Sequence, residues 1–150
     1  MYIHNNQSGV TLIELLVVMA IFLIIGVSGT SYYARFFNQN SVANTTDHLI
    51  GQLRKAQLYS LMSKQGVTSI WGVRYTSSPT KQITLFLQGN SAFDENYTVN
   101  PAVTISSDFE ITFAHVTGIP TPPGPTDITI SGVGSTQSIT LNTLGVVSKN

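Results

Sequence analysis

A single acidic residue, Glu14, stands near the start of an otherwise apolar run that continues to Val27. A carboxylate inside the hydrocarbon of a bilayer costs roughly 2.5–3.5 kcal/mol or more, so an acid in such a run is a functional candidate by default. The alternative is that Glu14 lies at the headgroup interface and has no function. The carboxylate and the apolar run that carries it are therefore the first features to explain.

Other side chains that could do chemistry are scattered along the chain. The histidines are His4, His48 and His115, and the close acid pairs are Asp94 with Glu95 and Asp108 with Glu110. No two histidines are four residues apart, and the acid pairs lack the dense oxygen pattern of a calcium loop. We expect no metal and no cofactor, although a calcium site at Asp94 and Glu95 stays open as an alternative. No nucleotide-binding or hydrolase motif is present, so we do not expect an enzyme.

The composition excludes several classes of partner. The 150 residues contain seven Lys plus Arg and seven Asp plus Glu, and charged residues make up 9% of the chain. That fraction is far below the roughly 25% of typical soluble domains. A neutral chain has little with which to neutralise phosphates, so we do not expect DNA binding. There is no Cys, which excludes a disulfide framework.

The N-terminal third combines a short polar leader with an uncharged segment. Residues 1–9 are polar, and residues 15–34 carry no charge. About 20 residues span the hydrocarbon as a helix, so residues 15–34 are a candidate transmembrane segment. A secretory signal peptide is the alternative, because an apolar core of thirteen residues, 15–27, also fits an h-region. The acid at the start of the run and the bulky Tyr32 and Tyr33 after it argue against that alternative.

Helical periodicity continues beyond the apolar run. Leu49, Leu53, Ala56 and Ser60 recur at three- and four-residue spacing and predict a buried stripe. No Pro interrupts the chain before Pro79, and Gly66 is the expected C′ residue of the helix. We therefore predict one helix over residues 10–65.

The period then changes to that of short strands separated by turn residues. The predicted strands are 67–75, 82–87, 102–106, 109–115, 127–131, 138–141 and 146–148. Residues 89–100 and the Pro-rich 118–126 are predicted to be long loops. The sequence thus predicts an α+β fold, in which a long N-terminal helix packs against one antiparallel sheet formed by residues 66–150.

The order of these segments resembles the type IV pilin-like family. The residues that carry the resemblance are Gly9 and the run Val10-Thr11-Leu12-Ile13-Glu14 with the apolar residues that follow. The resemblance implies cleavage after Gly9 by a prepilin peptidase and N-methylation of Val10. It also implies that the new amino group of Val10 and the carboxylate of Glu14 pair during assembly, within one chain or between neighbours. Two departures are visible: Val10 replaces the usual Phe or Met, and the leader has no Lys or Arg.

Weaker similarity extends to two later segments. Residues 49–57 and 139–147 resemble the minor pseudopilin H of type II secretion and the related FimT-like minor pilins. The resemblance implies a subunit of a pilus or secretion pseudopilus, anchored in the inner membrane with residues 66–150 outside the cytoplasm. Its partners would be the peptidase, the inner membrane and other pilin or pseudopilin subunits. The alternative is a secreted or membrane-anchored β-domain with a binding function.

One further pattern concerns modification. Asp94, Asn96 and Thr98 fit an acidic-x-Asn-x-Thr pattern that resembles bacterial N-glycosylation sites. Asn96 is therefore an expected surface residue of the 89–100 loop.

Overall fold

The computed structural model describes the chain except residues 1–9, 67 and 125, and it leaves out the side chains of residues 28–32 and 34. The predicted leader, with His4 and Gly9, lies outside the described residues. The chain divides into two compact units, Met1–Phe36 and Phe37–Asn150. A helix, α1 (Leu12–Leu61), contributes residues to both units, each of which is considered by itself.

The C-terminal end of α1 corrects one prediction. The helix ends at Leu61, and Ser63, with φ of 50°, takes the left-handed C′ position that was predicted for Gly66. The amide of Ser63 donates to the carbonyl of Ser60 (3.3 Å), and the amide of Lys64 donates to that of Tyr59 (3.0 Å). This pair of bonds is a Schellman motif, which satisfies the last helix carbonyls. The motif therefore ends α1 before Gly66 is reached.

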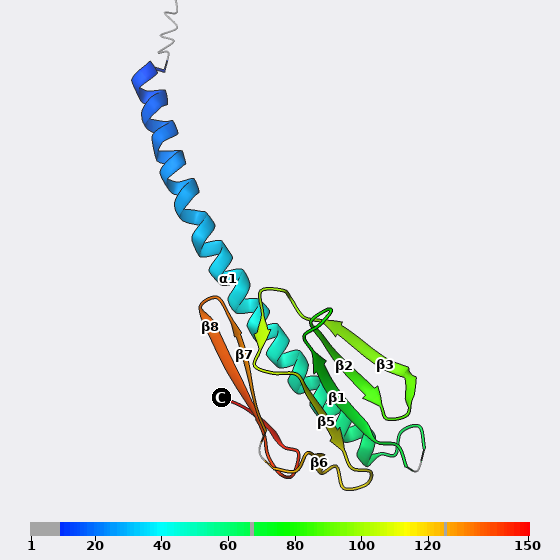
Figure 1. Ribbon diagram of the computed structural model, residues 1–150. Helices are drawn as coiled ribbons and strands as arrows, with labels where there is room; N and C mark the ends of the chain where they lie inside the picture. The colour runs from blue at the N-terminus through cyan, green and yellow to red at the C-terminus, as the bar shows by residue number, and fades with distance from the viewer. Residues whose placement is uncertain (1–9, 67, 125) are drawn as a thin grey trace, which may run out of the picture. The chain divides into compact units, whose positions relative to one another are not determined.

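The predicted α+β fold with antiparallel strands is confirmed, but the second unit contains two antiparallel sheets, so the prediction of one sheet was wrong. The strands are β1 (Trp71–Thr76), β2 (Gln82–Leu87), β3 (Asn90–Thr98), β4 (Thr104–Ile105), β5 (Phe109–Phe113), β6 (Pro120–Thr121), β7 (Thr126–Gly132), β8 (Ser135–Leu141) and β9 (Val147–Lys149). Five strands pair in the order β3-β2-β1-β5-β6 and four in the order β4-β7-β8-β9. Figure 1 shows the two sheets on either side of the last turns of α1.

Two segments predicted to be loops contain strands. Most of residues 89–100 form β3, an edge strand that pairs with β2 after a tight turn at Gly89, whose φ is 85°. Within β3, residues 91–94 lie opposite Phe86 alone, so the strand is strongly bulged. In residues 118–126, Pro120 and Thr121 form the short edge strand β6, a position where Pro removes no ladder bond that the sheet needs.

The core forms between α1 and both sheets, as the helical stripe predicted. Leu49, Leu53, Ala56 and Ser60 are all fully buried. The stripe extends to Val42, which approaches β7 so closely that a Cβ at Gly132 would lie 2.7 Å from Cγ2 of Val42. The strands contribute inward-facing side chains: Trp71, Val73, Tyr75, Ile83, Leu85, Ile111, Phe113, Ile128, Ile130, Ile139 and Leu141.

Substitution of Leu53 by Ala should lower the free energy of unfolding by about 2–5 kcal/mol, because it leaves a cavity at a fully buried position. Leu58→Ala is the matched control on the same helix, since the Leu58 side chain is 51% exposed, and its effect should stay below about 1 kcal/mol. Urea unfolding followed by the fluorescence of Trp71, the single Trp, measures both. Equal losses for the two variants would refute the assignment of the buried face.

Candidate functional site

The N-terminal part of α1 is apolar on every side. From Leu12 to Val27 the described large apolar side chains are between 45% and 82% exposed, and Glu14 is the one charged residue. A helix that is apolar all round is stable only when other apolar groups surround it, in a protein interior or a membrane. This segment is the candidate functional site, because nothing in its own unit provides that cover among the residues described.

The prediction that residues 15–34 span a membrane can be compared with the described part of the helix. Of the helical residues described, none form a stretch long and apolar enough to cross a membrane.

Glu14 occupies the third position of the helix, three residues after the capping residue Thr11. Thr11 is the N-cap: its carbonyl accepts from the amide of Leu15 (3.2 Å), and its Oγ1 accepts from the amide of Glu14 (3.3 Å). Thr-x-x-Glu is the residue pattern of a capping box, and a carboxylate in the first turn also interacts favourably with the helix dipole. Thr11 therefore caps the helix start, a role that was not predicted from the sequence, and Glu14 has the residue type and position of the second member of a capping box.

Val10 lies outside the helix, which begins at Leu12 and not at residue 10 as predicted. It is 71% exposed and precedes the N-cap by one residue. Val10 and Leu15 hold the two positions whose apolar side chains form a hydrophobic staple at a helix start. The chain between Val10 and Glu14 thus leads into the first turn of α1 through the N-cap Thr11.

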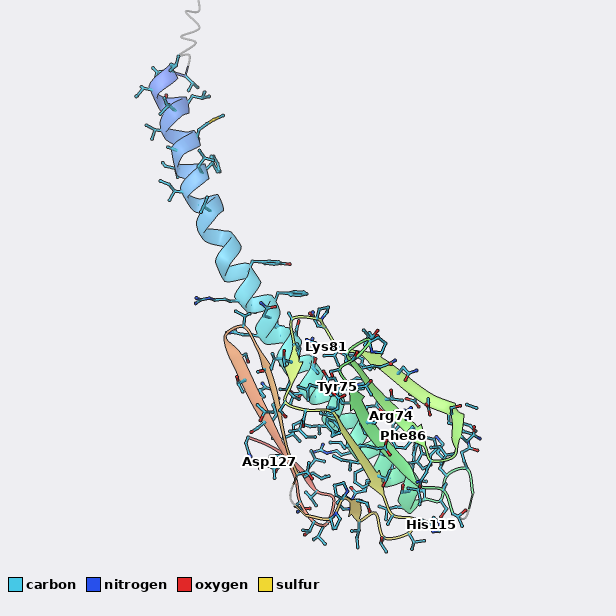
Figure 2. All side chains as sticks on the ribbon, viewed as in Figure 1. Arg74, Tyr75, Lys81, Phe86, His115 and Asp127 are labelled. Atoms are coloured by element: carbon cyan, nitrogen blue, oxygen red, sulfur yellow. The ribbon has the colours of Figure 1, made fainter. Side chains whose placement is uncertain are left out.

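The described histidines stand apart from each other. His48 lies on α1 and stacks on Tyr97 of β3, with ring centroids 3.8 Å apart and planes 19° apart. Its Nε2 lies 3.4 Å from the amide nitrogen of Gln52, and its buried Nδ1 has no hydrogen-bond partner among the described residues. His115 lies beyond β5 and contacts Oγ of Ser63 in the C-terminal turn of α1, at the end of the second unit where Figure 2 labels it.

The acid pair Asp94 and Glu95 does not form a common site. The two residues are neighbours in a strand, so their side chains point to opposite faces of the sheet. Glu95 pairs with Lys55 of α1 (2.6 Å), whereas Asp94 pairs on the outer face with Arg74 (3.3 Å). Arg74 also lies over the ring of Phe86, and Figure 2 labels both residues. In the part of the chain that the structure describes, no three metal-ligating side chains come together.

Two other predicted positions are found in strands and turns. Oδ1 of Asp108 accepts a hydrogen bond from the amide of Ser77 (3.0 Å). Asp108 therefore links the start of β5 to the end of its neighbour β1. Asn96 is exposed, but it lies in β3 and not in a loop, and its Oδ1 accepts from Oγ1 of Thr84 (2.8 Å). Glycosylation of Asn96 stays a prediction.

Comparison with known proteins finds one family model. The prokaryotic N-terminal methylation motif matches residues 4–30. The match covers the segment that contains Val10, Thr11 and Glu14 together with the apolar half of α1, and it supports a type IV pilin-like chain with a prepilin-type N-terminus. No curated protein and no solved structure matches the chain significantly.

The packing of His48 predicts that the free energy of unfolding depends on pH. Burial lowers the pKa of His48, and nearby Lys55 lowers it further, while Glu95 opposes the shift. A histidine whose pKa is lowered by folding binds a proton less readily in the folded chain than in the unfolded chain. Its contribution to stability is therefore complete above its ordinary pKa of about 6.5, and it is lost as pH falls through the lowered pKa. We expect the free energy of unfolding to decrease as pH falls from about 7 to 5.

The variant His48→Phe keeps a ring against Tyr97 but cannot titrate, so its unfolding free energy should depend less steeply on pH. Tyr97→Phe is the control that keeps both the stack and the wild-type pH dependence. Urea unfolding at several pH values measures the slopes. Identical slopes for the wild type and His48→Phe would show that this histidine does not couple folding to pH.

Proposed function

We propose that this chain is a prepilin-type structural subunit, processed at its N-terminus and assembled through the apolar half of α1. The proposal rests on two features that occur in the same segment of the chain. The methylation motif at residues 4–30 falls on the helix segment whose large side chains are exposed all round. A chain with such a segment needs neighbours to cover it, and assembly into a fibre provides them.

The proposed sequence of events begins at the membrane. The precursor resides in the inner membrane as a single-pass protein, with the unit Phe37–Asn150 outside the cytoplasm. A prepilin peptidase cleaves between Gly9 and Val10, and the new amino group of Val10 is methylated. That amino group remains positively charged, whereas an amide at the same position would be neutral.

The charge created at Val10 supplies the partner that Glu14 needs. Apolar helices packed together exclude water, so an unpaired carboxylate among them is costly, and one paired with an ammonium group is less so. Within the described residues Glu14 has no ion pair. We propose that it pairs with the amino group of Val10 in the same or a neighbouring chain, which fixes the axial register of the helices.

The finer proposal is a minor subunit similar to pseudopilin H or the FimT-like pilins. Two features support it. The Leu49, Leu53 and Ala56 stripe is buried, and a strand, a turn and a final strand end the chain, with Gly145 at φ of 81° between β8 and β9. The proposed role is structural and not catalytic, in a type IV pilus or a type II secretion pseudopilus.

Blocking the cut tests the processing step. Gly9→Val should leave the full-length precursor in cells that contain a prepilin peptidase, because the larger side chain stands at the proposed cleavage site. Gln7→Ala, two residues earlier, should be processed normally. Immunoblotting resolves the precursor from the mature chain. Normal shortening of Gly9→Val, or a cut near Tyr32, would favour an ordinary secretory signal over a prepilin leader.

The two roles of Glu14 can be separated by a pair of substitutions. Gln can occupy the third position of a capping box but carries no charge. If assembly requires the charge, Glu14→Gln and Glu14→Ala should both be cleaved normally and both be missing from sheared fibres. If the helix cap alone matters, Glu14→Gln should assemble as the wild type does, and that result would refute the proposed ion pair.

A further inference from the structure

A hollow of about 330 Å³ opens between α1 and the end of β3. The helix contributes Phe37, Asn40, Ser41, Asn44 and Thr45, and the sheet side contributes Tyr97 and Asn100. All of these residues belong to the unit Phe37–Asn150. The volume lies at the lower end of the roughly 300–1,000 Å³ range of small-molecule sites.

The polar groups of the hollow are neutral, and some of them are free to bind a ligand. Asn40 and Asn44 are exposed, lie one helical turn apart, and make no side-chain hydrogen bond among the described residues. Each amide offers two donors and one acceptor. Asn100 is held in place, because its Oδ1 accepts from the amide of Ala102 (2.9 Å) and its Nδ2 donates to Oγ of Ser41 (3.3 Å).

Two aromatic rings form the apolar part of the hollow. The Phe37 side chain is 53% exposed. Tyr97 is half-buried, and its ring is fixed by the stack on His48. Only one face of the Tyr97 ring can be covered by that stack, so the ring is a preorganised surface at the edge of the hollow. Preorganisation reduces the entropy that a ligand loses on binding.

The lining excludes most classes of ligand. It contains no charged side chain, so phosphate, nucleic acid, carboxylates and metal ions would find no compensating charge. A purely apolar ligand would cover Asn40 and Asn44 and leave their amides without water or a partner, which is costly. The remaining class carries several hydroxyl groups and an apolar face in one small, neutral unit.

We propose that this hollow binds a neutral saccharide. The hydroxyl groups of a pyranose ring would exchange hydrogen bonds with the amides of Asn40 and Asn44, while its C–H face would lie against Phe37 or Tyr97. The hollow lies in the second unit and uses none of the residues assigned to the N-terminal site, so the proposal does not rest on N-terminal processing.

Side-chain amide signals in NMR spectra test the proposal directly. The full mature chain, labelled with ¹⁵N, is held in phosphocholine micelles, whose headgroups contain no sugar, and titrated with diacetylchitobiose, cellobiose and maltose. At least one disaccharide should shift the side-chain amide signals of Asn40 and Asn44 in a saturable manner. Glycerol and inorganic phosphate, titrated in the same way, should not.

Substitutions then locate the site. Asn44→Ala and Phe37→Ala should each weaken the dissociation constant by roughly three- to tenfold, since each removes one interaction with the ligand. Asn38→Ala, an amide on the same helix that does not line the hollow, should bind as the wild type does. Unchanged backbone spectra confirm that the variants fold.

Three results would overturn the proposal. They are the absence of any shift with all three disaccharides at millimolar concentration, shifts that map away from the hollow, and shifts with phosphate that equal those with sugars. A fourth, in which the signals of Asn40 and Asn44 change with protein concentration alone, would assign this face to self-association instead of saccharide binding.

Discussion

The structure depends on one constraint, which is that the first part of α1 is apolar on every side and is not covered by any described residue of its own unit. Side chains from Leu12 to Val27 are apolar around the whole helix, so no single docking face could bury them. Farther along the same helix the pattern narrows to a stripe that both sheets can cover, and Leu49, Leu53 and Ala56 are buried there. The helix therefore changes from a segment that needs partners to one that provides the core of a folded unit.

Charge placement follows from the same constraint. Within the segment that needs partners, Glu14 is the one charged side chain, and it occurs in the first turn of the helix, where the helix dipole stabilises a carboxylate. In the second unit the charges of β3 are paired separately, Glu95 toward the helix and Asp94 toward the outer face. The chain has few charged side chains, but each described ion pair joins two elements that are distant in sequence and so helps to hold the second unit together.

Parts of this fold could be predicted because local patterns determine them. The stripe on α1 has the helical period, and the pairing strands β1, β2 and β5 are rich in β-branched and aromatic residues. β3 was missed because Asn90–Thr98 is poor in such residues. It is held as a strand by contacts made at long range, including the His48–Tyr97 stack and the Lys55–Glu95 pair. The helix end was misplaced because Ser63 adopts a left-handed conformation that is usual for Gly.

The candidate site divides in a similar way. A short motif in the sequence predicts roles for Gly9, Val10 and Glu14, whereas the capping role of Thr11 and the hollow beside Tyr97 depend on three-dimensional placement. The central claim is that a new charged amino terminus is created next to Glu14. Mass spectrometry of the N-terminal peptide of the mature chain tests it most directly. We expect a peptide that begins with N-methylated Val10. A peptide that begins at Met1 or near Tyr32 would contradict it.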